Sequence, residues 1–204
     1  PHKQYINDKG GVEHDPEEIL RNLFKAIRTA IDEAMIDPVQ ILALSISNQR
    51  ETSVAWDRNS GRAAYNAIVW QCGRAADICK KRESHAARIK KKTGLNLSPY
   101  FSASKFAWLL EEVPAVQNLA KNNSLVLSTI DSFLLYHLSE EHTIQTEPSN
   151  ACRTQLLNIH SLSWDEELCS LFGIKTEQLP TIVDSDAIFG HTTLGGLLST
   201  PIPL

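Results

Sequence analysis

The feature that most constrains this fold is an apolar stripe that begins just after Asp15-Pro16. Asp15 has the chemistry of an N-cap, Pro16 suits the first helical position, and Glu18 follows three residues after the cap. Apolar residues then recur at three- and four-residue steps, at Ile19, Leu23, Ala26, Ile27, Ala30, Ile31 and Ala34. The pattern predicts an amphipathic helix that ends before Asp37-Pro38 and must pack its apolar face against another element.

The segments after this helix alternate between strand and helix patterns. Residues 41–47 form a nearly continuous apolar run, which predicts an interior strand covered on both faces. Two further strands are predicted at 53–57 and 67–70, separated by a turn at 58–61. Helices are predicted at 74–92, 102–112, 128–138 and 164–172, with Gly94 and Gly173 as stop signals. Strands followed by helices indicate an α/β lobe.

Composition narrows the class of protein. With 204 residues, 42% of them hydrophobic and 22% charged, the chain fits one ordinary globular domain or lobe. A formal net charge of -4 excludes the basic footprint that nucleic-acid binding needs, so no nucleic-acid partner is expected. No apolar run reaches the roughly 18 to 20 residues of a membrane span. The start at Pro1 and the extended end at 201–204 indicate a piece of a longer chain.

Motifs for other chemistries are missing from the sequence. The four cysteines show no C-x-x-C spacing, and no H-E-x-x-H motif or acidic calcium loop occurs, so no metal site is predicted. No G-x-S-x-G elbow supports a hydrolase. Unpaired cysteines are typical of a reducing compartment, and the cytoplasm is the expected location.

Arg50-Glu51 and the pair Trp70 and Tyr100 are the candidate ligand-binding residues. Arg50 and Glu51 end a predicted buried strand, where α/β folds place ligands. A guanidinium donates and a carboxylate accepts, so together they suit a polyhydroxyl ligand, although an ion pair at a strand end is an alternative. Trp70 and Tyr100 could form an aromatic wall for such a ligand or belong to the core. The residue chemistry alone leaves both alternatives open.

Several long motifs resemble those of the FGGY family of carbohydrate kinases, and within it the glycerol kinases. The two most specific are Asn48-Gln49-Arg50-Glu51-Thr52 and Tyr65-Asn66-Ala67-Ile68-Val69-Trp70-Gln71-Cys72. Further matching stretches lie at 12–16, 54–57, 93–95, 98–102, 129–132, 149–154, 157–160 and 164–165. The resemblance therefore covers nearly the whole chain.

The resemblance implies an actin-like, ribonuclease-H-like α/β lobe, with a mixed sheet and flanking helices, as the first of two lobes. Residues 1–204 would then be part of the N-terminal domain of an ATP-dependent glycerol kinase, with ATP and Mg²⁺ between the lobes. The phosphate loop would precede residue 1 and the catalytic base would follow residue 204. No catalytic or cofactor-binding residue is therefore assigned, the isolated chain is expected to be inactive, and the run at 41–47 is expected to expose a sheet edge.

By motif position, the resemblance implies that Arg50, Glu51 and Tyr100 contact the glycerol hydroxyls and that Trp70 is the apolar wall behind the carbon atoms. It also implies a homo-oligomer for the complete protein. The sequence departs from the family pattern at Gly73, Ala75, Ser98 and Glu147-Pro148. These departures leave two alternatives, a kinase of another polyol or sugar and a truncated, non-catalytic product that acts as a binding or regulatory module.

Overall fold

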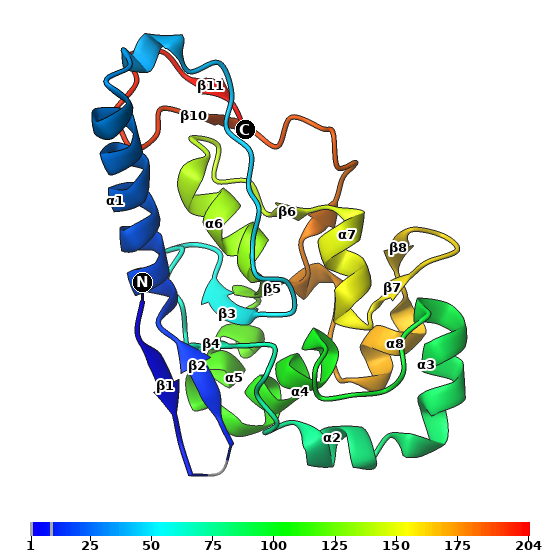
Figure 1. Cartoon of the computed structure of the whole chain (residues 1–204). Helices are drawn as coiled ribbons and strands as arrows, with labels where there is room; N and C mark the ends of the chain where they lie inside the picture. The colour runs from blue at the N-terminus through cyan, green and yellow to red at the C-terminus, as the bar shows by residue number, and fades with distance from the viewer. Residues whose placement is uncertain (1, 9) are drawn as a thin grey trace.

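A five-stranded sheet forms the centre of the molecule. The computed structural model describes residues 2–8 and 10–204 (Figure 1). The strands occur in the spatial order β1-β2-β4-β3-β5, and each neighbouring pair is antiparallel. Their bounds are β1 Gln4–Ile6, β2 Val12–His14, β3 Ser53–Asp57, β4 Ala67–Ile68 and β5 Leu125–Thr129.

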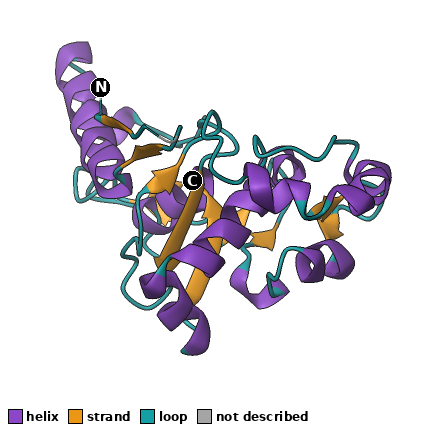
Figure 2. Cartoon of the chain, turned by 90° about the horizontal axis from the view of Figure 1, so that it is seen from below, coloured by secondary structure: helices purple, strands orange, loops and turns teal. Residues whose placement is uncertain are grey.

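Helices surround this sheet, and three small sheets lie beside it. Figure 2 shows helices on both sides of the central strands. The α-helices are α1 Pro16–Ala34, α2 Ala76–Lys80, α3 Ala86–Thr93, α4 Ser102–Glu112, α5 Pro114–Lys121, α6 Ile130–Leu138, α7 Pro148–Ala151 and α8 Glu166–Leu171. The 3₁₀ turns are η1 Pro38–Gln40, η2 Glu83–His85, η3 Cys152–Thr154 and η4 Thr176–Gln178.

The small sheets contain both kinds of strand pairing. The strand β6 Gln145–Thr146 runs parallel to β9 Thr181–Ile182. Two antiparallel pairs complete the set: β7 Leu157–Asn158 with β8 Ser163–Trp164, and β10 His191–Thr192 with β11 Ile202–Pro203. The expectation of an α/β lobe with mixed pairing and flanking helices is confirmed.

Alternating side chains of β3 divide the core into two clusters. Ala55 packs with Phe106 of α4 on one face, whereas Val54 and Trp56 pack with Phe133 of α6 on the other. This alternation follows from the two-residue period of a strand. The indole Nε1 of the fully buried Trp56 donates to Ser128 Oγ on β5 at 3.0 Å, so the one polar atom of this side chain is satisfied.

The N-terminal helix agrees with its sequence signals. The Asp15 side chain accepts from the Glu17 amide, and Pro16 occupies the first turn. The helix α1 ends at Ala34, where Met35 adopts a left-handed conformation with a φ of 52°. Its side chains that pack against the α6 side of the core are Ile19, Leu20, Leu23, Phe24 and Ile27. The amphipathic helix is confirmed, although the alanines of the predicted stripe are exposed.

The prediction of an interior strand at 41–47 is wrong. These residues are extended, but in the part of the chain that the structure describes they belong to no sheet, and a single backbone hydrogen bond joins them to β11. The Leu44 amide donates to the Pro203 carbonyl at 3.0 Å, and Leu42 is 80% exposed. A strand exists only through hydrogen bonds to a neighbour, and an extended segment without them leaves its polar backbone to water.

The helix predicted at 74–92 is divided into α2, η2 and α3. Arg82 lies at the break, where its guanidinium donates to the carbonyls of Ile78 and Leu171 and lies 5.2 Å from the ring centre of Phe172. These tertiary contacts outweigh a helix propensity that differs little among ordinary residues. Gly94 ends α3 in the left-handed conformation, as predicted.

The other elements agree in part. The helix α4 has the predicted bounds, and α8 lies within the predicted range and stops before Gly173. The helix predicted at 128–138 begins at Ile130 because residues 125–129 form β5 beside β3. The strand predicted at 67–70 is only two residues long. No pattern in the sequence predicted the β1–β2 hairpin or α5 as elements of the fold.

Candidate functional site

The junction between the extended segment and β3 is held in an unusual conformation at Glu51. Its φ is 63°, in the left-handed region that a residue with a side chain rarely adopts. The Glu51 carbonyl accepts from Ser53 Oγ at 3.2 Å and from Ser102 Oγ at 3.3 Å, so β3 and α4 both hold this turn. Such strain persists only where surrounding contacts impose it, and it concentrates at functional sites.

Glu51 pairs with Arg153, a residue that the sequence analysis did not select. Glu51 is only 4% exposed, and its Oε1 accepts from Arg153 Nε at 2.5 Å. The Arg153 guanidinium also lies 4.9 Å from the ring centre of Phe101 and 5.8 Å from that of Tyr100. Arg153 belongs to the motif at 149–154, which was the only signal in the sequence for it. The structure thus adds Arg153 to the candidate site.

Arg50 and Glu51 do not form the ion pair that was one alternative for them. Arg50 is exposed, and its guanidinium has no hydrogen-bond or ion-pair partner among the residues that the structure describes. Its positive charge acts on the Cys152 thiol, whose pKa burial raises and both Arg153 and Arg50 lower. Arg50 and Arg153 thus both act on the Cys152 thiol, and the guanidinium of Arg50 is not engaged by any of the described side chains.

Trp70 and Tyr100 contact each other beside this pair. Their ring centres are 5.6 Å apart at an interplanar angle of 55°. Trp70 lies two residues after β4 and is 39% exposed, so it is not a core residue, whereas Tyr100 precedes α4 and is half-buried. Two aromatic faces from separate segments thus meet at the surface, with Arg153 linking Tyr100 to Glu51. The structure brings Glu51, Trp70 and Tyr100 into one connected site.

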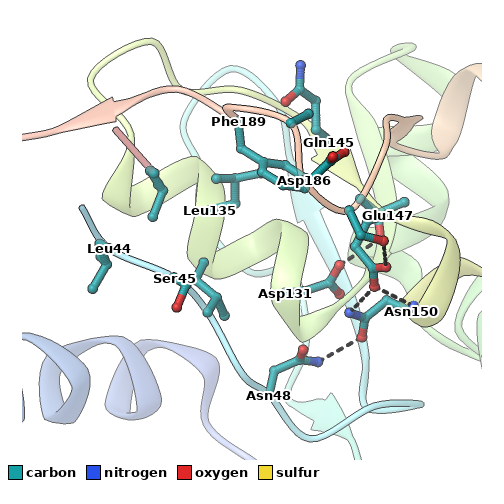
Figure 3. A pocket seen from close by; sticks show the side chains of 15 residues that line it. Leu44, Ser45, Asn48, Asp131, Leu135, Gln145, Glu147, Asn150, Asp186 and Phe189 are labelled. Atoms are coloured by element: carbon teal, nitrogen blue, oxygen red, sulfur yellow. Dashed lines mark hydrogen bonds between the residues drawn. The ribbon is translucent and has the colours of Figure 1, made fainter. Parts of the chain in front are cut away.

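A cavity of about 220 Å³ lies between the extended segment at 44–46 and the helices α6 and α7 (Figure 3). Its polar walls include Asn48, Asp131, Glu147 and Asn150, and its apolar walls are Leu44, Ile46, Leu135, Phe189 and Leu204. Asn48 Nδ2 donates to Asn150 Oδ1 at 2.9 Å, and this bond ties the start of the junction to α7. None of the four predicted ligand contacts lines the cavity.

The carboxyl group of Asp131 in this cavity is already satisfied. Thr129 Oγ1 donates to its Oδ1, and Thr146 Oγ1 donates to its Oδ2 at 2.6 Å. Burial raises the pKa of Asp131, although these hydroxyl groups oppose the shift. Through these two hydrogen bonds, the buried Asp131 on α6 links β5 and β6, so its carboxyl group needs no ligand as a partner.

The described residues contain neither a cluster of metal-ligating side chains nor a helix suited to a membrane. In the described ranges, 2–8 and 10–204, no group of three or more His, Cys, Asp and Glu side chains converges as metal ligands do. Nor does any described helix combine the length and apolar character that crossing a bilayer requires. The four cysteines are all free.

Solved structures define the class of protein. A crystal structure of Plasmodium falciparum glycerol kinase with ADP matches with a TM-score of 0.90 and 33% identity, over 99% of this chain and 41% of that chain. A xylulose kinase from Lactobacillus acidophilus shares the fold alone, with a TM-score of 0.84 and 24% identity, over 100% of this chain and 41% of that chain. The fold is that of a carbohydrate kinase lobe.

Sequence comparisons identify the family. Residues 1–199 match the N-terminal domain of the FGGY family of carbohydrate kinases, and the chain belongs to this family. Glycerol kinase 1 of Thermotoga maritima is 49% identical over 100% of this chain and 42% of the relative. The glycerol kinase of Thermococcus onnurineus is 45% identical over 98% of this chain and 40% of the relative. The chain thus spans about two fifths of the length of these relatives.

Proposed function

We propose that this chain is the glycerol-orienting part of a glycerol kinase and that residues 1–204 belong to its N-terminal domain. The complete enzyme transfers the γ-phosphoryl group of ATP to a terminal hydroxyl of glycerol. One observation carries the proposal: Glu51, Arg153, Tyr100 and Trp70 form a connected site in a chain that is 49% identical to a glycerol kinase.

The polar groups of the site match a small neutral polyol. Arg153 occupies Glu51 Oε1, and in the described part of the chain no donor reaches Oε2, which can therefore accept from a ligand hydroxyl. The unpaired Arg50 guanidinium donates to hydroxyl oxygens, and the Tyr100 phenol does the same from the aromatic side. Each hydroxyl both donates and accepts, so a carboxylate beside a guanidinium satisfies it fully.

The aromatic groups suit the carbon skeleton of the same ligand. A polyol has apolar C–H faces, and an exposed indole ring provides a flat surface for them. Trp70 has this exposure, and its contact with Tyr100 fixes the angle between the two rings. We therefore assign Trp70 as the apolar wall and Arg50, Glu51 and Tyr100 as the hydroxyl contacts.

The proposed enzyme uses ATP with Mg²⁺, which neutralises phosphate charge in such transfers. Among residues 2–8 and 10–204, no group of three or more His, Cys, Asp and Glu side chains converges as metal ligands do, and we assign no residue of this chain to Mg²⁺. No step of phosphoryl transfer and no catalytic base is therefore assigned to this chain. Its contribution is orientation of the substrate, which by itself accelerates a reaction by fixing the geometry of attack.

Kinetics of the protein encoded by the complete reading frame test the proposal. Arg50→Ala and Glu51→Gln each remove a charge-assisted hydrogen bond, so we expect kcat/KM for glycerol to fall. The fall should correspond to a loss of roughly 2 to 4 kcal/mol of transition-state stabilisation. Tyr100→Phe removes one neutral hydrogen bond and keeps the ring, so its expected cost is about 0.5 to 1.5 kcal/mol.

Matched controls make this test specific. Arg62→Ala removes an exposed arginine from the β3–β4 turn, and Glu112→Gln removes an exposed carboxylate at the end of α4. Both should leave kcat/KM for glycerol unchanged. An Arg50→Ala or Glu51→Gln enzyme within about threefold of wild type would contradict the assignment.

Two further assays separate the remaining alternatives. A panel of polyols and sugars distinguishes a glycerol kinase from a kinase with another substrate. The 204-residue chain alone should show no ATP-dependent phosphorylation of glycerol, since no base or phosphate loop is assigned to it. A complete reading frame that encodes these residues alone would instead favour a non-catalytic binding or regulatory product.

We further propose a cytoplasmic location, in keeping with four free cysteines. We also propose that the complete protein is a homo-oligomer, which gel filtration with light scattering tests.

A further inference from the structure

A buried lysine lies directly beneath the candidate site. Lys105, in the first turn of α4, is 0% exposed, and a lysine is almost never buried so deeply without a specific partner. Its Nζ donates to the carbonyl oxygen of Tyr100, five residues earlier in the chain. Lys105 thereby binds the backbone of the residue whose side chain we assign to the ligand.

Burial disfavours the charged form of the Lys105 amine, and nearby groups oppose this effect. Burial lowers the pKa of Lys105 to about 8, and the groups that oppose this shift are Cys72, Glu51 and Cys79. Glu51 belongs to the candidate site, Cys72 follows β4, and Cys79 lies on α2. The negative charge of Glu51 therefore favours the ammonium form of the lysine beneath it.

The first turn of α4 thus holds two site residues through two separate side chains. Ser102 Oγ donates to the Glu51 carbonyl at 3.3 Å, and Lys105 Nζ donates to the Tyr100 carbonyl. Tyr100 precedes the helix, so its carbonyl lies outside the regular hydrogen bonds of α4. Without Lys105, the Tyr100 carbonyl loses this hydrogen bond, and the backbone that positions the Tyr100 ring against Trp70 is less firmly held.

We infer that Lys105 is a positioning residue for the polyol site, one that fixes Tyr100, and with it the aromatic wall, without contacting the ligand. The inference rests on the proposed function. A buried lysine that serves stability alone would support the fold and leave ligand affinity unaffected. The two roles differ in what a substitution does to the KM for glycerol once the protein is folded.

The experiment uses the protein from the complete reading frame, with glycerol and ATP as substrates. Lys105→Met keeps the length and apolar stem of the side chain but removes the donor, whereas Lys105→Gln keeps a shorter donor. We expect Lys105→Met to raise the KM for glycerol at least tenfold and to leave the KM for ATP within twofold. Lys105→Gln should lie between wild type and Lys105→Met.

Leu109→Ala is the matched control. Leu109 is fully buried one turn later on α4, so this variant destabilises the same helix and has no polar contact with the site. All kinetics are measured well below the melting temperature of each variant. We expect Leu109→Ala to lower that temperature while the KM for glycerol stays within twofold of wild type.

The outcomes separate this inference from the proposed function. If Lys105→Met and Lys105→Gln both keep the KM for glycerol within twofold while Arg50→Ala loses efficiency, the positioning role is wrong and the function stands. If Leu109→Ala raises that KM as much as Lys105→Met does, the role is structural and the inference is also wrong. If Lys105→Met does not fold, Lys105→Gln decides by the same criterion. A wild-type enzyme that does not phosphorylate glycerol overturns both proposals.

Discussion

The extended segment at 41–47 and the strand β3 differ sharply in the structure although both are short apolar runs. Val54, Ala55 and Trp56 of β3 are buried, whereas Leu42 in the extended segment is exposed to water. The strand β3 pairs with β4 on one edge and β5 on the other. In the described part of the chain, the segment at 41–47 belongs to no sheet and makes only one backbone hydrogen bond to a strand, from Leu44 to β11. Paired edges, and not apolar composition, distinguish the two.

The two faces of β3 show what pairing makes possible. Once β4 and β5 satisfy the backbone, side chains on both faces of β3 can be buried against helices. The extended segment buries one side only, where Leu44 and Ile46 pack against the α6 side of the core. We therefore expect substitutions in β3 to cost far more stability than substitutions in the segment.

The largest expected effect is that of Trp56→Ala. Truncation of this fully buried side chain leaves a cavity and an unpaired Ser128 hydroxyl, and we expect a loss of about 3 to 5 kcal/mol in the free energy of unfolding. Leu42→Ala, at an exposed position, should cost less than about 0.5 kcal/mol. Urea denaturation of both variants measures the difference. Similar losses in the two would show that the segment is packed as tightly as the strand.

The second effect concerns the junction that joins the two regions. Arg153→Met removes the partner of the buried Glu51 carboxylate, so we expect a loss of about 1 to 3 kcal/mol in the free energy of unfolding. Arg62→Met, an exposed arginine, is the matched control. A loss below about 0.5 kcal/mol for Arg153→Met would contradict a stabilising role of this ion pair at the junction.

Leu44→Ala tests the inward side of the extended segment. Leu44 is half-buried and packs against the α6 cluster, so its truncation should cost about 1 kcal/mol. Leu42 lies two residues away on the same segment and is 80% exposed, and its truncation should have almost no effect. Equal melting temperatures for the two variants would contradict the role of Leu44 as an anchor of the segment.

The smallest expected effect is a dependence of stability on acid pH. It arises at Glu147, which is linked through Asn150 to Asn48 just after the extended segment. Burial alone raises the pKa of Glu147, but hydrogen bonds from Ser149, Ser185 and Asn150 outweigh it and lower the pKa from 4.5 to about 2. A group with a lowered folded pKa contributes stability that is present above its unfolded value and lost as the pH falls through the folded one.

Glu147 accepts from Asn150, which in turn accepts from Asn48, so protonation of Glu147 weakens the anchor of the segment. Between about pH 5 and about pH 2, the melting temperature of wild type should therefore fall more steeply than that of Glu147→Gln. Glu112→Gln, which also removes one carboxylate, should keep the wild-type slope. Parallel curves for wild type and Glu147→Gln would disprove the link.

Local signals explain which parts of the fold the sequence predicted. The Asp15 cap, Pro16 and the apolar stripe fixed the start of α1, and Gly94 fixed the end of α3, because each signal acts within one turn of the chain. The break at Arg82 depends on the Leu171 carbonyl, 89 residues away in sequence, and no local pattern encodes it.

The candidate site divides in the same way. Arg50, Glu51, Trp70 and Tyr100 could be selected from motifs and residue chemistry, and the structure brings Glu51, Trp70 and Tyr100 together through Arg153. Neither Arg153 as the partner of Glu51 nor Lys105 as the partner of the Tyr100 carbonyl was predicted. Glu51 and Arg153 are 102 residues apart, and spacing along the chain does not show such a pairing.

Motifs and local patterns in the sequence were enough to predict the family, the start and end of several helices, and the kinds of residue that could hold a polyol. The folded chain was needed to see that residues 41–47 are not a strand, that Glu51 adopts a left-handed backbone, and that a buried lysine supports Tyr100. The physical reason is the range of the interactions. Caps and turns are satisfied within a few residues, whereas strand pairing and the burial of a charge depend on partners that folding brings from distant parts of the chain.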